Sequence, residues 1–243
     1  MNAAYWIRRA GNGVRKVAAG LTPFGESVWP GVRNNLFVAH ESIYGYFERY
    51  AKGRRVFDAG CGAGYGADRL LRGGARSVLG VDLDPRSVRY ARRCYSRPGL
   101  TFEVGDCEEL ALDPSSFDLV VSSNMIEHLA RPERFLESLR GALAPAGEAI
   151  LAMPPLTTVE AFTENAEIHY HRSNLGVDQW ITMFEAGGWR WELVAHRFGR
   201  AAPRLDFGSP FPSTLSEADF VFEPSSRDDV YARVPYTAVF LLH

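Results

Sequence analysis

The sequence predicts an α/β fold in which a mainly parallel sheet is covered by helices on both faces. Short apolar runs typical of buried strands alternate with helix-length segments. A glycine-rich turn also joins the first of these runs to the helix that follows it. The chain has 243 residues, which favours one domain, since domains hold roughly 100–200 residues. A domain of this size buries a core without a disulfide or a metal staple.

Seven apolar runs and five helical segments support this fold. Strands are expected at residues 54–60, 75–83, 100–106, 116–124, 148–154, 189–198 and 236–243, and helices at 35–51, 64–71, 85–95, 132–143 and 175–188. Pro85 occupies a position that favours the first turn of a helix. Gly187 and Gly188 are typical of a helix end.

Two regions interrupt the regular alternation. Residues 1–53 are predicted to form an N-terminal arm and cap helices, and residues 54–243 the main domain. The first 20 residues are basic and suit either a surface-packed arm or an arm for a partner. Residues 199–229 are rich in Pro, Ser and acids and are predicted to be an insertion, because connections longer than about 12–15 residues are usually lids, binding loops or disordered.

Composition excludes several classes of protein. The net charge of −2 gives no general electrostatic case for nucleic-acid binding. No stretch approaches the roughly 18 apolar residues of a membrane span. Cys61, Cys94 and Cys107 suit neither a disulfide framework nor a zinc centre, because no CxxC pair is present. With no signal-peptide pattern, we expect a cytoplasmic protein without a metal centre.

The turn after the first predicted strand contains Gly60, Gly62 and Gly64. Glycine allows positive φ and a close approach of the backbone to a ligand. Ligands of open parallel sheets lie beyond the carboxyl ends of the strands. Gly62-x-Gly64-x-x-Ala67 also fits a loose dinucleotide fingerprint, so an NAD(P)-dependent Rossmann oxidoreductase is an alternative.

Three acids lie at the ends of three successive predicted strands: Asp58, Asp82 and Asp106. If these strands are parallel, the carboxylates converge on one edge of the sheet, where they would repel a pyrophosphate. S-adenosylmethionine offers each acid a partner: its ammonium for Asp58, its ribose hydroxyls for Asp82 and its adenine amine for Asp106. The methionine carboxylate would then use amides near the next helix N-terminus. The alternative is that the three acids are only helix caps and turn formers.

Five segments in order, VFDAGCGAGYG, LGVDLDP, VGDCEEL, FDLVVSSNMIEHL and LAPAGEAILAMP, resemble the motifs of class I S-adenosylmethionine-dependent methyltransferases. The resemblance implies a Rossmann-like, doubly wound sheet of seven strands with helices on both faces and an antiparallel last strand. It assigns S-adenosyl-L-methionine as cofactor. The cofactor-binding residues it implies, with their neighbours, are Asp58, Gly60, Cys61, Gly62, Gly64, Asp82, Leu83, Asp106, Cys107 and Asn124.

Flanking segments resemble a bacterial subgroup often associated with glycans, sugars or secondary metabolites. Gly25-Glu26 and the pair His40 and Tyr44 resemble its leader, and the pair is expected to cap the cofactor pocket. Ala39 and Ile43 stand where the subgroup has Glu and Arg, which puts the acceptor in doubt. The segment 168–172 resembles the subgroup's histidine-containing segment.

A hydroxyl group that receives a methyl group must lose its proton, so the site needs a base. Histidine can serve as this base near neutral pH. The candidates are His128, which follows the fourth strand, and His169 and His171, of which the motif favours His169. In an extended segment the last two would point the same way and form a base or, with a third ligand, a metal site. We therefore predict O-methylation of a small sugar-containing molecule or secondary metabolite. A non-methylating member of the fold, such as a cyclase or a binding protein, is a further alternative, and a homo-oligomer is left open.

Overall fold

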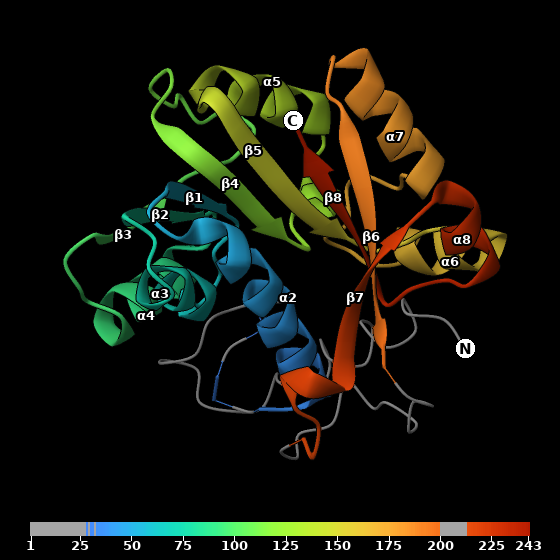
Figure 1. Cartoon of the computed structure of the whole chain (residues 1–243), viewed down its shortest axis with the longest axis horizontal. Coiled ribbons are helices and arrows are strands. Elements are labelled where there is room, and N and C mark those ends of the chain that lie inside the picture. The colour runs from blue at the N-terminus through green and yellow to red at the C-terminus, as the bar shows by residue number, and fades with distance from the viewer. Residues whose placement is uncertain (1–27, 29, 32, 200–212) are drawn as a thin grey trace.

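A single eight-stranded sheet forms the centre of the protein (Figure 1). The computed structural model describes residues 28, 30–31, 33–199 and 213–243. The strands are β1 (Arg55–Ala59), β2 (Ser77–Asp82), β3 (Leu100–Val104), β4 (Phe117–Ser123), β5 (Leu143–Met153), β6 (Trp191–Phe198), β7 (Phe220–Ser225) and β8 (Thr237–Leu242). The helices are α2 (Asn35–Ala51), α3 (Tyr65–Arg72), α4 (Pro85–Cys94), α5 (Pro132–Ala142), α6 (Val159–Ala166), α7 (Val177–Ala186) and α8 (Arg227–Ala232), with short 3-10 turns η2 (Ile126–His128) and η3 (Glu217–Asp219).

The strand order is β3-β2-β1-β4-β5-β8-β6-β7. The first five strands pair in parallel. β8 is antiparallel to both β5 and β6, which confirms the predicted fold class and the antiparallel last strand. The sheet has one strand more than the seven expected, because the segment predicted as an insertion contributes β7, which pairs antiparallel with β6.

Successive side chains of the central strands enter cores on opposite faces of the sheet. In β1, Val56 packs in one core and Phe57 in the other. Helices α2, α3 and α4 cover the face of Val56, and α5, α7 and α8 cover the face of Phe57. This alternation of buried residues places the strand ends, and whatever they bind, at the edge of the sheet between the two helical layers.

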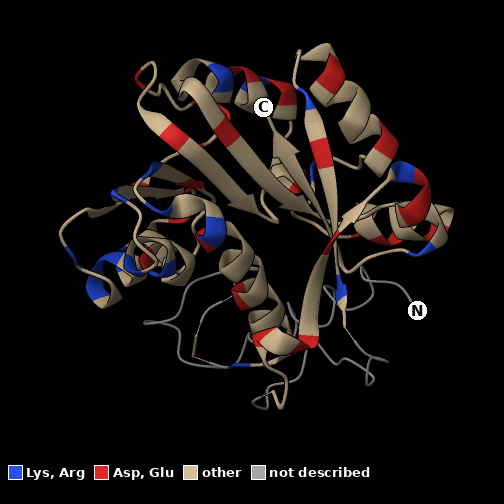
Figure 2. Ribbon diagram, viewed as in Figure 1, with Lys and Arg blue, Asp and Glu red and all other residues tan. Residues whose placement is uncertain are grey.

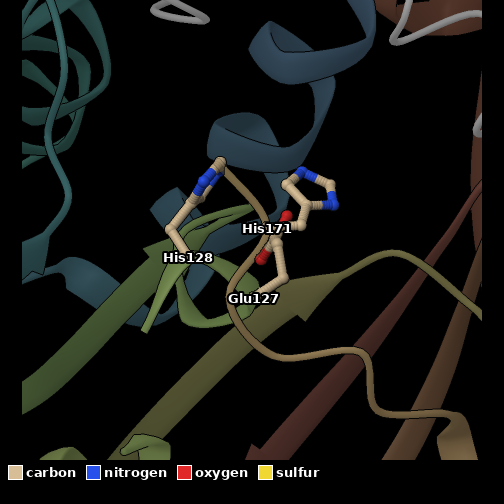
Figure 3. Close-up of side chains that lie close together, drawn as sticks. All are labelled: Glu127, His128 and His171. Carbon is tan, nitrogen blue, oxygen red and sulfur yellow. The ribbon is translucent and has the colours of Figure 1, made fainter. Parts of the chain in front are cut away.

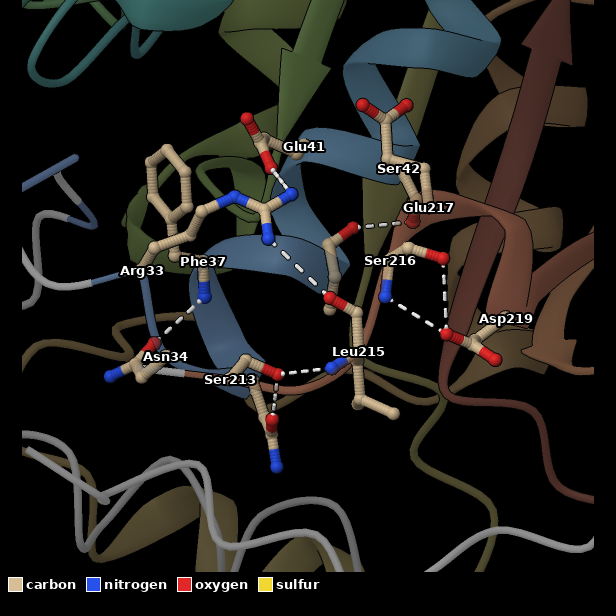
Figure 4. A network of polar contacts seen from close by, with 12 residues as sticks. Arg33, Asn34, Phe37, Glu41, Ser42, Ser213, Leu215, Ser216, Glu217 and Asp219 are labelled. Carbon is tan, nitrogen blue, oxygen red and sulfur yellow. Dashed lines mark hydrogen bonds and ion pairs between the residues drawn. The ribbon is translucent and has the colours of Figure 1, made fainter. Parts of the chain in front are cut away.

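Helix α2 is held by the segment that leads into β7 (Figure 4). The Arg33 guanidinium pairs with Glu41 at 2.7 Å and donates to the Leu215 carbonyl oxygen at 3.4 Å. Arg69 of α3 pairs with Glu48 of α2 at 2.8 Å and with Glu217 at 2.6 Å. The chain beside β7 therefore packs against the N-terminal helix. The predicted arm at residues 1–20 and the Gly25-Glu26 leader lie outside the described residues.

Charged residues of both signs lie on most helices, whereas α4 carries arginines and no acid (Figure 2). Among the described residues, no helix combines the length and the apolar character that a membrane crossing requires.

Phe184 tests the packing of the core on the Phe57 face of the sheet. Its side chain is fully buried on α7, and its ring centroid lies 5.1 Å from that of Phe240 in β8. We expect Phe184→Ala to lower the free energy of unfolding by about 3–5 kcal/mol, because the truncation leaves a cavity. Denaturant unfolding measures this loss. Val159→Ala is the control, since Val159 is 77% exposed and should change stability by less than about 0.5 kcal/mol; equal losses in the two variants would contradict this packing.

Candidate functional site

The three predicted acids meet at the carboxyl edge of the sheet. Asp58 lies in β1, Asp82 ends β2, and Asp106 follows β3 by two residues. These strands are neighbours in the order β3-β2-β1 and run in parallel, as the prediction required. The buried thiol of Cys107 interacts electrostatically with all three carboxylates, which also raise its pKa after burial, to about 12. The acids therefore form one cluster around the end of the glycine turn.

The glycine turn has the backbone that its sequence predicts. Gly60, Gly62 and Gly64 have φ of 76°, 51° and 81°, in the region that favours glycine. A Cβ at Gly60 would collide with the Met125 side chain, so the turn packs directly on the loop after β4. A Cβ at Gly62 would meet no atom within 4 Å. The turn is thus tightly packed at Gly60 and borders open space at Gly62, where a ligand has room.

Asp58 is a fully buried carboxylate, and Tyr44 of α2 donates a hydrogen bond to it, with Oη–Oδ1 at 3.0 Å. Burial raises the pKa of Asp58 to about 7, with the nearby Asp82 charge adding to the rise and the Tyr44 hydrogen bond opposing it. A buried carboxylate is costly unless it is neutralised or paired. The side chain is therefore suited to receive a cation, and Tyr44 is placed to orient it.

Asp82 is tied to the glycine turn. Its Oδ2 accepts from the Gly62 amide at 2.8 Å, and its Oδ1 accepts from the Asp84 amide at 2.9 Å. Burial raises its pKa, and these two hydrogen bonds act in the opposite direction. The next side chain, Leu83, is 68% exposed at this rim. An acid beside an exposed apolar side chain matches a ligand that presents hydroxyl groups next to a flat ring.

The other residues predicted to bind the cofactor differ in their burial and in their partners. Cys61 lies within the glycine turn and is buried, and burial followed by the Asp58 charge raises its pKa. Asn124 follows β4 with φ of 50°. Asp106 Oδ1 accepts from the Glu108 amide at 2.9 Å.

His40 is half-buried with its pKa lowered to about 4 by burial, and it interacts electrostatically with His196. Only Tyr44 of the predicted capping pair contacts the acids.

A second group of side chains lies beyond β4 (Figure 3). Glu127 and His128 belong to η2, and His171 comes from the connection between α6 and α7. The ligand atoms of these three residues all lie within 4.8 Å of one another. The rings of His128 and His171 meet edge to face with centroids 4.8 Å apart. Two imidazoles and a carboxylate from distant parts of the chain thus converge on one point.

Hydrogen bonds orient both imidazoles. His128 Nδ1 lies 3.1 Å from the Tyr170 carbonyl oxygen, and His171 Nδ1 lies 2.5 Å from Asn165 Oδ1. Burial lowers the pKa of His128, and it lowers the pKa of His171 to about 3, assisted by the neighbouring His128. Both shifts favour the neutral imidazole, and His128 also makes a backbone hydrogen bond at Asn124.

The expected extended segment around His169 is not found. Residues 168–171 form a turn, closed by a hydrogen bond from the His171 amide to the Ile168 carbonyl oxygen at 3.0 Å. His169 is consequently exposed, while His171 packs on His128. The predicted common direction of His169 and His171 is wrong, because a turn does not preserve the alternation of an extended strand. The catalytic use of His169 stays a prediction.

Sequence reasoning missed Glu127 and Asn165. Glu127 adjoins His128 in the quoted IEHL segment and is 4% exposed, so an acid within an apolar turn was the available signal. Asn165 lies on α6, which the sequence did not predict, and its Nδ2 donates to Asn174 Oδ1 at 3.0 Å. No local pattern connects Asn165 with His128.

Residues 57–151 match a family model described as a methyltransferase domain. A probable S-adenosylmethionine-dependent methyltransferase of Mycolicibacterium smegmatis is 32% identical over 170 residues, which are 69% of this chain and 65% of the relative. A possible histamine N-methyltransferase of Thermotoga maritima has the same fold, with a TM-score of 0.63, 19% identity and coverage of 85% of this chain and 90% of that one.

Relatives with a named acceptor differ in chemistry. A ubiquinone biosynthesis O-methyltransferase of Methylocella silvestris is 34% identical over 48% of this chain and 46% of its own length. A tRNA U34 carboxymethyltransferase of Hahella chejuensis is 30% identical over 54% of this chain and 44% of its own length. The chain spans less than two thirds of the curated relatives it matches, so the comparisons identify the family rather than the acceptor.

The acid cluster and the glycine turn suit S-adenosylmethionine on structural grounds. The buried Asp58 lacks the charge compensation that an ammonium supplies, Asp82 faces the turn, and Gly62 borders open space. A dinucleotide pyrophosphate would meet three carboxylates instead. The fold, the matched domain and this acidic edge together show that the chain belongs to the class I S-adenosylmethionine-dependent methyltransferases.

Proposed function

We propose that this protein transfers the methyl group of S-adenosylmethionine to a hydroxyl oxygen of a small molecule. The observation that carries the proposal is the side-by-side placement of an acid cluster and a histidine cluster at one edge of the sheet. Met125 packs at Gly60, and His128 follows it by three residues, so the two clusters adjoin. One cluster suits the cofactor and the other suits an acceptor that must lose a proton.

Within this proposal, each residue of the acid cluster has one task. Asp58, oriented by Tyr44, pairs with the ammonium of the cofactor. Asp82 accepts from the ribose hydroxyls, with Leu83 against the adenine and Asp106 at its amine. The cofactor supplies an electrophilic methyl group, and the protein contributes mainly position and orientation. His40, Cys61, Cys107 and Asn124 are proposed to line the same pocket.

The proposed acceptor is a sugar-containing molecule or a secondary metabolite. Support comes from the leader and histidine segments in the sequence and from the small-molecule O-methyltransferases among the relatives. The net charge of −2 favours a small acceptor over a nucleic acid. The free thiols of Cys61, Cys94 and Cys107 favour a reducing compartment, so we also propose a cytoplasmic location.

Product analysis tests the function. The protein is incubated with methyl-labelled S-adenosylmethionine and a panel of hydroxylated sugars, glycosides and phenols, with tRNA as a separate arm. We expect S-adenosylhomocysteine to form with a small-molecule acceptor and the label to enter an ether linkage. Label in tRNA alone would contradict the small-molecule acceptor. Tight binding of NADH without binding of S-adenosylmethionine would contradict the function.

Asp82→Ala should weaken S-adenosylmethionine binding about 10- to 100-fold. The variant removes hydrogen bonds to a charged group, each worth about 1.5–3 kcal/mol. Isothermal titration calorimetry measures the change. Asp113→Ala is the matched control, because Asp113 is exposed and lies outside the acid cluster. An Asp82→Ala affinity equal to that of the control would remove Asp82 from the cofactor site.

Cofactor affinity should rise with pH between 5.5 and 7.5. The pKa of Asp58 is raised to about 7, so the carboxylate is largely protonated below this pH and cannot pair with an ammonium. Ionisation through the pKa should strengthen binding by about 20-fold over this range. Titrations at several pH values give the profile, and in Asp58→Asn it should flatten. A profile with the same slope in both proteins would show that another group controls it.

A further inference from the structure

We propose that Glu127, His128 and His171 bind one divalent transition-metal ion at the acceptor side of the pocket. The three side chains each offer one ligand atom, and these atoms lie within 4.8 Å of one another (Figure 3). The sequence analysis expected no metal centre and considered a metal site only at His169 with His171. Glu127 and His128 are adjacent in the chain, whereas His171 follows His128 by 43 positions. Their convergence is a property of the fold.

The donor set selects the class of metal. Two imidazole nitrogens and one carboxylate are the ligands of catalytic zinc sites, which keep a fourth position for water or substrate. Magnesium and calcium prefer oxygen ligands throughout. The chemistry therefore points to Zn²⁺ or a similar first-row divalent ion, and a three-ligand site leaves coordination for an acceptor oxygen.

The surroundings of the histidines are those of metal ligands. A metal-binding imidazole usually places its second nitrogen against a carbonyl or a carboxylate, which fixes the ring and its tautomer. His128 Nδ1 has the Tyr170 carbonyl oxygen at 3.1 Å, and His171 Nδ1 has Asn165 Oδ1 at 2.5 Å. Asn165 is 1% exposed, and its bond to Asn174 sets which end of its amide faces His171.

The backbone holds the two halves of the site together. The amides of Arg172 and Ser173 donate to the Glu127 carbonyl oxygen at 3.0 and 2.9 Å. The segment that carries His171 is therefore fastened to the turn that carries the other two ligands. Such a fixed arrangement reduces the ordering cost of binding a metal ion.

The site has a role that rests on the proposed function. A cation held beside the acceptor would lower the pKa of its hydroxyl group. The proton leaves to solvent, the oxygen bonds to the methyl carbon, and the carbon–sulfur bond of S-adenosylmethionine breaks to leave S-adenosylhomocysteine. Metal binding itself is independent of this role and is measured without any acceptor.

The test is titration of tag-free, chelator-treated protein with Zn²⁺ by calorimetry and with Co²⁺ by visible absorption. A Cys94→Ser background removes the exposed thiol as a competing ligand. We expect one ion per chain and a cobalt spectrum typical of low coordination number. His171→Ala and Glu127→Gln should each weaken metal binding more than about 100-fold. Loss of a residue that only hydrogen-bonds to a metal ligand typically weakens binding about 10- to 100-fold.

Matched variants separate ligation from folding. His169→Ala removes an exposed histidine two residues from His171 and should leave metal affinity unchanged. Asn165→Leu should weaken binding about 10- to 100-fold, and Asn165→Asp, which keeps an oxygen against His171, should restore it. Thermal unfolding of each metal-free variant, together with its affinity for S-adenosylmethionine, reports whether the fold is intact.

Absence of stoichiometric Zn²⁺ and Co²⁺ binding by the parent protein would overturn the proposal. Equal affinity in the His171→Ala and His169→Ala variants, with both folded, would also overturn it. Metal binding without methyl transfer to any acceptor would uphold the site and refute the proposed function, so the two failures are distinguishable.

Discussion

A carboxylate buried at the end of the central strand is the constraint on which the site depends. Asp58 is removed from solvent, with Tyr44 as hydrogen-bond donor and Asp82 nearby as a like charge. Burial without a cation drives it toward the neutral acid, at a cost to the folded protein. A positively charged ligand reverses this cost, so affinity for a cation is built into the position of the side chain. The acid edge thereby favours a sulfonium-bearing amino acid over a diphosphate.

The sheet order explains why this edge exists. Parallel strands β3, β2 and β1 end on the same side, so residues far apart in sequence meet there without long connections. The loop after β4 lies against the glycine turn through Met125 and Gly60 and carries Glu127 and His128. The acid cluster and the turn with Glu127 and His128 are thus neighbouring parts of one edge, an arrangement that suits the in-line transfer proposed above.

The sequence predicted the features that depend on local pattern. Strand ends, the glycine turn and the position of Asp82 follow from apolar runs, φ preferences and residue order, and the structure has them. It missed the eighth strand, because the short apolar run at residues 220–222 lies within a Pro-, Ser- and acid-rich segment, and the pairing of β7 with β6 is a tertiary contact. It also could not place His171 against His128 and Asn165, because a turn at residues 168–171 replaced the expected extended segment. Long-range convergence of this kind leaves no periodic signal.

The pairing of Asp58 with the ammonium of the cofactor is tested most directly by a thermodynamic cycle that combines a protein variant with a modified ligand. S-adenosylhomocysteine and its analogue without the α-amino group are titrated into the parent protein and into Asp58→Asn. If Asp58 pairs with the ammonium, loss of the amino group should weaken binding to the parent about 10- to 100-fold, the value of a charge-assisted hydrogen bond. The same change should have little effect in Asp58→Asn. An equal loss in both proteins would show that Asp58 does not contact the ammonium and would contradict the account.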